Sequence, residues 1–105
     1  MAVNGVRYEN SLIVMPDRIA EDWQVQDLES LVQDDIEVLA ALKPELVLLG
    51  TGDILRFPDP QLLLCLTHAG IGAEVMDTRA ACRTYNILAE EGRDVAAALI
   101  IAQRS

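Results

Sequence analysis

The chain is poor in the residues that build many functional sites. Among its 105 residues it holds one lysine, one histidine, two cysteines and four aromatic residues. Nucleic acids and anionic membranes are held by clustered Lys and Arg, so the shortage of cations argues against both as partners. No apolar run approaches the roughly 20 residues of a membrane span. Because only four residues are aromatic, the core must be built from Leu, Val, Ile and Ala, which suits helices packed on a sheet.

Acidic residues are abundant and unevenly placed. Residues 1–59 hold twelve acidic and four basic side chains, and residues 60–105 hold five and four, which gives −8 and −1 and sums to the net charge of −9. The simpler interpretation is a solvated face that keeps the protein soluble. The alternative is an acidic patch that meets a basic partner protein.

The order of predicted elements indicates one α/β domain over residues 1–105, with an N-terminal β-hairpin at about 1–15 and an α/β core at about 28–102. Asn4-Gly5 has the composition of a two-residue hairpin turn. Its second arm covers 6–8 and leads into a strand at 12–15 that Pro16 ends. The later elements are a helix over 28–42, a buried strand over 46–49, a helix over 60–69, a strand over 73–76, a helix over 78–91 and a strand over 95–102.

Three local signals mark helix starts. Ser30 with Gln33 resembles a capping box, which would begin the regular helix near residue 31. Asp59 precedes a proline at a first helical position, and Asp77 or Thr78 precedes the long third helix. Trp23, in a polar segment, is expected to cover the core with its N–H bonded to a partner.

The candidate site lies where two buried strands end in small polar residues. In open α/β sheets, ligands bind beyond the carboxyl ends of the strands. Helical spacing then places two arginines and an asparagine on one face of the third helix. We predict a crevice for a carboxylate or phosphate formed by Gly50, Thr51, Gly52, Thr78, Arg79, Arg83 and Asn86. The alternatives are a tight turn at the glycines and arginines paired with the many carboxylates.

No motif predicts a catalytic or metal centre. Gly50-x-Gly52 lacks the third glycine of a dinucleotide fingerprint, since Leu55 stands there. Cys65 and His68 supply two ligands at helical spacing, and no second pair completes a zinc site. Cys82 and His68 would form a dyad only if the fold brought them together. We expect no metal and no cofactor, and no motif argues for or against an enzyme. The two cysteines, interpreted as buried thiols, indicate a cytoplasmic protein.

Several segments together resemble a small family of unassigned biochemistry. They are Leu49-Gly50-Thr51-Gly52, Phe57-Pro58, Gly70-Ile71-Gly72 and, most specific, the run from Met76 to Leu88 followed by Glu91-Gly92-Arg93. The family includes the mitochondrial respiratory complex I assembly factor three, the adipogenesis-associated Mth938-domain proteins and many bacterial members.

The resemblance implies a three-layer α/β fold with a central mixed sheet, flanking helices and an N-terminal β-hairpin. It also implies a role in helping other proteins assemble, with no established enzymatic activity or cofactor. We therefore expect a bacterial, cytoplasmic accessory factor that binds protein partners, which include respiratory-complex assembly intermediates. The contrasting hypothesis is a small-molecule binder or weak enzyme at the crevice. Self-association as a homodimer is also open, because a short N-terminal arm leaves a sheet edge to cover.

Overall fold

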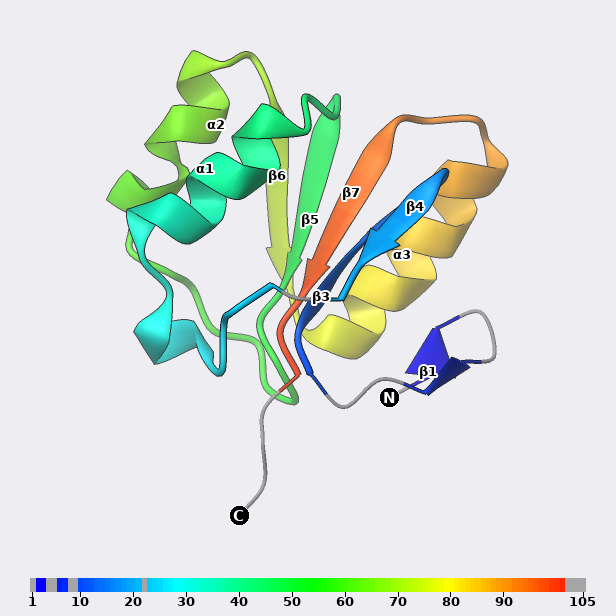
Figure 1. The fold of residues 1–105 in the computed structure, drawn as a ribbon, viewed down its shortest axis with the longest axis horizontal. Helices are drawn as coiled ribbons and strands as arrows, with labels where there is room; N and C mark the ends of the chain where they lie inside the picture. Colours follow the sequence, from blue (N-terminus) through cyan, green and yellow to red (C-terminus); the bar gives the residue numbers. More distant parts are fainter. Residues whose placement is uncertain (1, 4–5, 8–9, 22, 102–105) are drawn as a thin grey trace.

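A five-stranded mixed sheet forms the middle of the molecule. The computed structural model describes residues 2–3, 6–7, 10–21 and 23–101. The strands lie in the order β4-β3-β7-β5-β6 (Figure 1). β5 runs parallel to β6 and β7, and β3 runs antiparallel to β7 and β4. Their bounds are β3 Leu12–Met15, β4 Arg18–Ala20, β5 Leu46–Gly50, β6 Gly72–Met76 and β7 Val95–Leu99.

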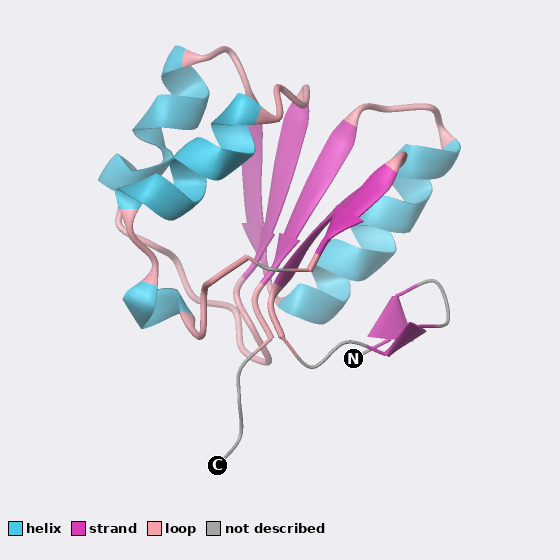
Figure 2. Cartoon of the chain, in the orientation of Figure 1, coloured by secondary structure: helices cyan, strands magenta, loops and turns pink. Residues whose placement is uncertain are grey.

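Helices cover both faces of this sheet, which gives three layers (Figure 2). One face carries the short 3-10 helices η1 (Leu28–Ser30) and η2 (Pro60–Leu63) with α1 (Gln33–Ala41) and α2 (Leu64–His68), and the other carries α3 (Thr78–Glu90). Successive strand side chains point to opposite faces. Thus Val47 and Leu49 join the core under α1 and α2, while Leu48 joins the core under α3. The predicted three-layer α/β fold is confirmed.

Trp23 covers the core on the α1 side, as predicted. Its side chain is 6% exposed, and its Nε1–H donates to the Asp35 carbonyl oxygen over 3.3 Å. On the opposite side, Ala81 and Tyr85 are the buried residues of α3 that pack against β3, β5 and β7. Ala81 and Tyr85 are four positions apart, which is the spacing of residues on one face of a helix.

Two of the three predicted helix starts are confirmed. The Asp59 carboxylate accepts from the Gln61 N–H, and the Asp77 carboxylate accepts from the Ala80 N–H. The Ser30–Gln33 capping box is wrong. Ser30 instead donates its N–H to Asp27, and Asp35 accepts from the N–H of Val32 just before α1. Two aspartates thus cap η1 and α1 separately, so the regular helix begins at Gln33 rather than near residue 31.

The N-terminal β-hairpin is confirmed by its two paired strands, but it is shorter than the predicted span of about 1–15 because β3 is not part of it. β1 (Ala2–Val3) and β2 (Val6–Arg7) pair antiparallel in a small sheet of their own. The predicted turn at Asn4-Gly5 lies outside the described residues. β3 belongs to the central sheet and forms a second hairpin with β4, in which Met15 pairs with Arg18 across Pro16-Asp17. Sequence analysis missed β4 because three residues are too few to display an alternating pattern.

The last strand is shorter than predicted, because β7 ends at Leu99 rather than at 102. Beyond it, the Ile100 N–H donates to the Gly50 carbonyl oxygen and the Ile101 N–H donates to Ser11 Oγ. Among the described residues, no helix is long and apolar enough to cross a membrane.

Candidate functional site

The carboxyl ends of β5 and β6 meet in a tightly closed contact that we call the Thr78 crossing, defined by Gly50, Gly52, Thr78 and Ile100. The chain leaves β5 toward the α2 face and leaves β6 toward the α3 face, which is the arrangement that opens a ligand crevice in many sheets. Here the backbones touch instead. A Cβ atom at Gly50 would lie 2.9 Å from Thr78 Cα and 3.3 Å from Ala81 Cβ. Glycine at position 50 is therefore explained by close packing.

The Thr78 hydroxyl joins three segments at this crossing. It accepts from the Gly52 N–H over 2.8 Å and donates to the Ile100 carbonyl oxygen over 2.8 Å. The Thr78 N–H donates in turn to the Gly52 carbonyl oxygen over 2.9 Å. Thr78 is 4% exposed, so these bonds lie out of water. The hydroxyl that we predicted as a ligand contact is engaged in holding the end of β5 to α3 and to the segment after β7.

Thr51 is used in a similar way by its own loop. Its Oγ1 donates to the Ile54 carbonyl oxygen over 2.9 Å and accepts from the Arg56 N–H over 3.2 Å. The Thr51 backbone N–H donates to the Met76 carbonyl oxygen. The side chain shapes the turn that follows β5, and it is 6% exposed.

The other predicted site residues lie on the outer surface of α3. Arg79, Arg83 and Asn86 are exposed, whereas Thr78 is buried in the first turn of the same helix. The Asp77 carboxylate caps that first turn and accepts from the Ala80 N–H. The fold thus brings together Gly50, Gly52 and Thr78 and leaves the two arginines and the asparagine on a separate surface. Ligand binding at these residues stays a prediction.

The candidate nucleophile and its base are separated by the sheet. His68 ends α2 and is exposed, and Cys65 packs against the core on that face. Cys82 packs against the core under α3 on the opposite face, so a dyad with His68 is not formed. Burial raises the pKa of the Cys82 thiol, which disfavours the reactive thiolate. Both cysteines are half-buried rather than fully buried. The described residues contain no group of three or more metal-ligating side chains.

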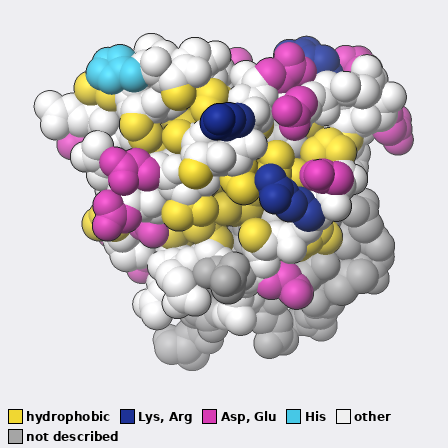
Figure 3. All heavy atoms as spheres, turned by 45° about the horizontal axis from the view of Figure 1, so that its top comes forward, with side chains coloured by type: hydrophobic (Ala, Val, Ile, Leu, Met, Phe, Trp, Pro, Cys, Tyr) yellow, Lys and Arg dark blue, Asp and Glu magenta, His cyan; other side chains and the backbone are white. Residues whose placement is uncertain are grey.

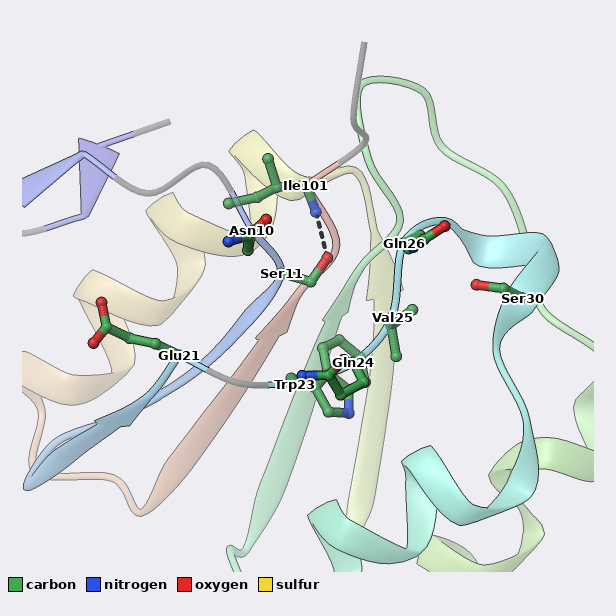
Figure 4. Close-up of a pocket in the computed structure, with 9 residues that line it drawn as sticks. All are labelled: Asn10, Ser11, Glu21, Trp23, Gln24, Val25, Gln26, Ser30 and Ile101. Carbon is green, nitrogen blue, oxygen red and sulfur yellow. Dashed lines mark hydrogen bonds between the residues drawn. The ribbon is translucent and has the colours of Figure 1, made fainter. Parts of the chain in front are cut away.

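A polar hollow lies beside the end of β7, where the sequence offered no signal (Figure 4). Its volume is about 560 Å³. Trp23 and Val25 form a buried apolar part, and amide and hydroxyl side chains surround them. Segments distant in the sequence contribute the described lining, which is Asn10, Ser11, Glu21, Trp23, Gln24, Val25, Gln26, Ser30 and Ile101. Only the fold brings them together, which is why spacing in the sequence could not reveal the hollow.

The segment after Thr51 exposes large apolar side chains, and we call residues 54–57 the apolar loop. Phe57 is 75% exposed, Ile54 is 64% exposed and Leu55 is 47% exposed. The remaining residue, Arg56, forms an ion pair with Glu29 of η1. A pocket of about 250 Å³ lies between η1, this loop and Ile100. Sequence analysis assigned no functional role to this stretch, although three large apolar residues within four positions are a signal that it could have used.

Apolar side chains also gather on another face of the molecule. Figure 3 shows them in the middle of that face, with acidic side chains on both sides. Among the described large apolar residues, however, Phe57 and Ile54 of the apolar loop are the two most exposed. Scattered apolar residues are normal on protein surfaces, whereas contiguous exposed ones mark interaction sites. The neighbouring and highly exposed residues of the apolar loop therefore make it the stronger candidate for an interaction site.

Comparison with known proteins gives a consistent family. A family model described as a protein of unknown function (DUF498/DUF598) matches residues 1–100. The Bos taurus protein named NADH dehydrogenase [ubiquinone] 1 alpha subcomplex assembly factor 3 is 35% identical over 100 residues, which is 93% of this chain and 54% of that protein. The chain thus spans about half the length of the curated relatives that it matches first.

Solved structures agree with the fold. An NMR structure from Xanthomonas campestris has a TM-score of 0.87 and 41% identity, and the match covers 97% of this chain and 77% of that one. A Bordetella pertussis protein described as a Mth938-like domain has a TM-score of 0.83 and 31% identity, over 97% of this chain and 80% of that one. The resemblance inferred from Met76 to Leu88 and the glycine motifs is confirmed.

Proposed function

Because the chain belongs to the DUF498/DUF598 family, which has relatives named as NADH dehydrogenase assembly factors, we propose that it is a non-catalytic accessory factor that binds another protein. The named role belongs to longer relatives, of which this chain covers about half. Respiratory-complex assembly intermediates are the partners that we propose to test first.

The apolar loop is the single observation that carries this proposal. Phe57, Ile54 and Leu55 keep about half or more of their surfaces in water. Such exposure forfeits about 25 cal/mol for each Å² of apolar surface that could be buried. Aromatic side chains are enriched at the centres of protein interfaces. A partner that covers the loop would recover this burial.

Binding is favoured over catalysis by how the nearby polar groups are used. The hydroxyls of Thr51 and Thr78 already have donors and acceptors within the chain. Among the described residues, no buried side-chain nitrogen or oxygen lacks a partner. We place the protein in the cytoplasm, and the free thiols of Cys65 and Cys82 support a reducing compartment.

A site-specific cross-linker tests the proposal directly. A photo-reactive phenylalanine analogue replaces Phe57 in the full chain, inside cells of the source organism, and products are identified by mass spectrometry. The matched control carries the analogue at Ile87, which is 59% exposed on α3. We expect a defined protein partner cross-linked at 57 and absent at 87, with loss of the product when Leu55→Ser is added.

The opposite result is equally clear. If the products at 57 and 87 are the same background proteins, the apolar loop does not bind a partner and the proposed function fails. Thermal unfolding of Leu55→Ser shows whether this variant loses the cross-linked product only because it is unfolded. We expect it to change stability by less than about 0.5 kcal/mol, because the residue is half-exposed in a loop.

A further inference from the structure

The pocket beside the apolar loop combines an apolar floor with acidic walls. Leu28, Ile54 and Ile100 contribute apolar surface to the cavity of about 250 Å³. Asp27 and Glu29 line it from η1, and Asp53 lines it from the turn after Gly52. A side chain with an apolar stem and a cationic end matches this arrangement. Lys and Arg bury such stems along apolar surface while their charged ends stay near water or carboxylates.

The surrounding charge is strongly negative. The pocket and the apolar loop, with their neighbours in the sequence, carry a net charge of −3. The four acidic residues are Asp27, Glu29, Asp53 and Asp59, and the one basic residue is Arg56. Arg56 pairs with Glu29, so the net −3 is the charge of Asp27, Asp53 and Asp59. The whole chain carries −9. Complementary potentials speed encounter and reject partners of the same sign, so an acidic rim selects a basic partner.

We infer that the apolar loop and its pocket bind a basic, apolar segment of a partner protein; this rests on the proposed function and names the chemistry of the partner. A Lys or Arg stem of that segment packs over Leu28 and Ile54. Its cation faces Asp53 and Glu29, whose carboxylate it shares with Arg56. A large apolar neighbour in the same segment packs on Phe57. The ring face of Phe57 also attracts a cation that passes over it.

Other occupants match this surface less well. A phosphate or carboxylate ligand would meet the carboxylates of the rim. A second copy of the chain would bring another −9 toward it, and like charges placed face to face cost several kcal/mol. The described residues also contain no cluster of three metal-ligating side chains that could hold a cation in this pocket.

Peptide titration of the isotope-labelled full chain, followed by amide NMR shifts, tests the inference. The probe is a capped peptide of alternating Lys and Leu, with two matched peptides in which Glu replaces Lys or Ser replaces Leu. We expect shifts centred on residues 27–29 and 51–57 with the Lys/Leu peptide. We expect at least about tenfold weaker binding of the other two, and weaker binding of the first at higher salt.

Paired charge variants locate the effect. Glu29→Gln with Asp53→Asn removes two carboxylates from the pocket, and Asp34→Asn with Glu37→Gln removes two exposed ones from α1. We expect about a tenfold loss of Lys/Leu peptide affinity in the first and less than about twofold in the second. Equal losses, equal binding of the Glu peptide, or shifts centred elsewhere would overturn the inference.

The failure of this inference differs from the failure of the proposed function. If cross-linking at Phe57 captures a partner that the Glu29→Gln/Asp53→Asn variant still captures fully, the loop binds protein and the basic chemistry is wrong. If the only product is a cross-linked dimer of the chain, with a doubled mass by light scattering, a second copy occupies the loop and the inference is also overturned.

Discussion

The two stretches that follow β5 behave in opposite ways, although they are neighbours in the sequence. At the Thr78 crossing, Gly50 and Gly52 lie against α3 and against Ile100, and the polar atoms bond within the chain. In the apolar loop, Phe57 and Ile54 have most of their surfaces in water. Small residues are thus internal at the Thr78 crossing, whereas large apolar residues are external in the apolar loop.

This contrast reverses the usual expectation from residue type. Glycine and threonine after a strand suggest a ligand turn, and Ile, Leu and Phe suggest core. The crossing needs small residues because two backbones approach within contact distance. The loop is held by Thr51, whose hydroxyl bonds the Ile54 carbonyl and the Arg56 N–H, so its side chains are presented outward from a fixed backbone.

Thr78→Val should have the largest effect on stability, because it removes the buried hydroxyl of the Thr78 crossing. Valine keeps the shape but removes the hydroxyl. The buried Gly52 N–H then loses its acceptor, and the Ile100 carbonyl oxygen loses this donor. We expect a loss of about 2–4 kcal/mol in the free energy of unfolding, measured with denaturant. Thr78→Ser, which keeps the hydroxyl, should lose less than half as much. If Thr78→Val has the same free energy of unfolding as the parent, the hydrogen bonds of the crossing do not stabilise the fold.

Gly50→Ala tests the closeness of the backbones. Its Cβ would lie 2.9 Å from Thr78 Cα, so the helix or strand must shift. We expect a loss of about 1–3 kcal/mol. Gly72→Ala is the matched control in the adjacent strand, where the nearest atom is the flexible Leu46 Cδ1 at 3.2 Å. Equal melting temperatures for the two variants would contradict the packing described here.

Glu45→Gln tests an exposed polar contact at the other end of the sheet, between the residue before β5 and the residues before β7. Glu45 Oε1 accepts from Arg93 Nε over 2.6 Å and from the Asp94 N–H over 3.1 Å. The hydrogen bond from Arg93 holds the pKa of Glu45 below its ordinary value of 4.5. A lowered pKa stabilises the fold above the unfolded-state value, and this stabilisation disappears as pH falls through the folded-state value.

The parent should therefore melt slightly above Glu45→Gln at neutral pH, and the two melting temperatures should converge as the pH falls below 4.5 and through the lowered pKa of Glu45. Thermal unfolding over a pH series measures this. The pair is well exposed and screened by salt, so the difference should be smaller than for the Thr78 and Gly50 variants. A gap that persists at low pH would assign the effect to something other than the carboxylate charge.

Arg79→Ala with Arg83→Ala should have the smallest effect of all. Both side chains are exposed on α3 away from the crossing, so we expect a change within about 0.5 kcal/mol. The same samples test the predicted anion crevice with added inorganic phosphate. A phosphate-induced rise in melting temperature that occurs in the parent and is lost in the double variant would support an anion site on α3.

Much of the fold was predictable, because its signals are local. Leu46 to Leu49 is apolar without a break, which indicates a strand buried on both faces. The spacing of Ala81 and Tyr85 indicated the buried side of α3, and Asp59 and Asp77 marked the starts of their helices. β4 was missed because three residues give too little pattern. The Ser30–Gln33 box was wrong because the Asp27 carboxylate accepts from the Ser30 N–H, and Asp35 accepts from the Val32 N–H at the start of α1.

The sequence by itself determined the three-layer α/β architecture, the acidic character and the family, since periodicity, composition and motifs are properties of the chain alone. Only the tertiary structure decided what the residues after β5 do. Whether the Thr78 hydroxyl faces a ligand or neighbouring segments depends on Gly52 and Ile100, which lie 26 and 22 positions away from it along the chain. Burial is likewise a property of the assembled layers, and it alone separates Phe57 on the surface from the leucines of the core.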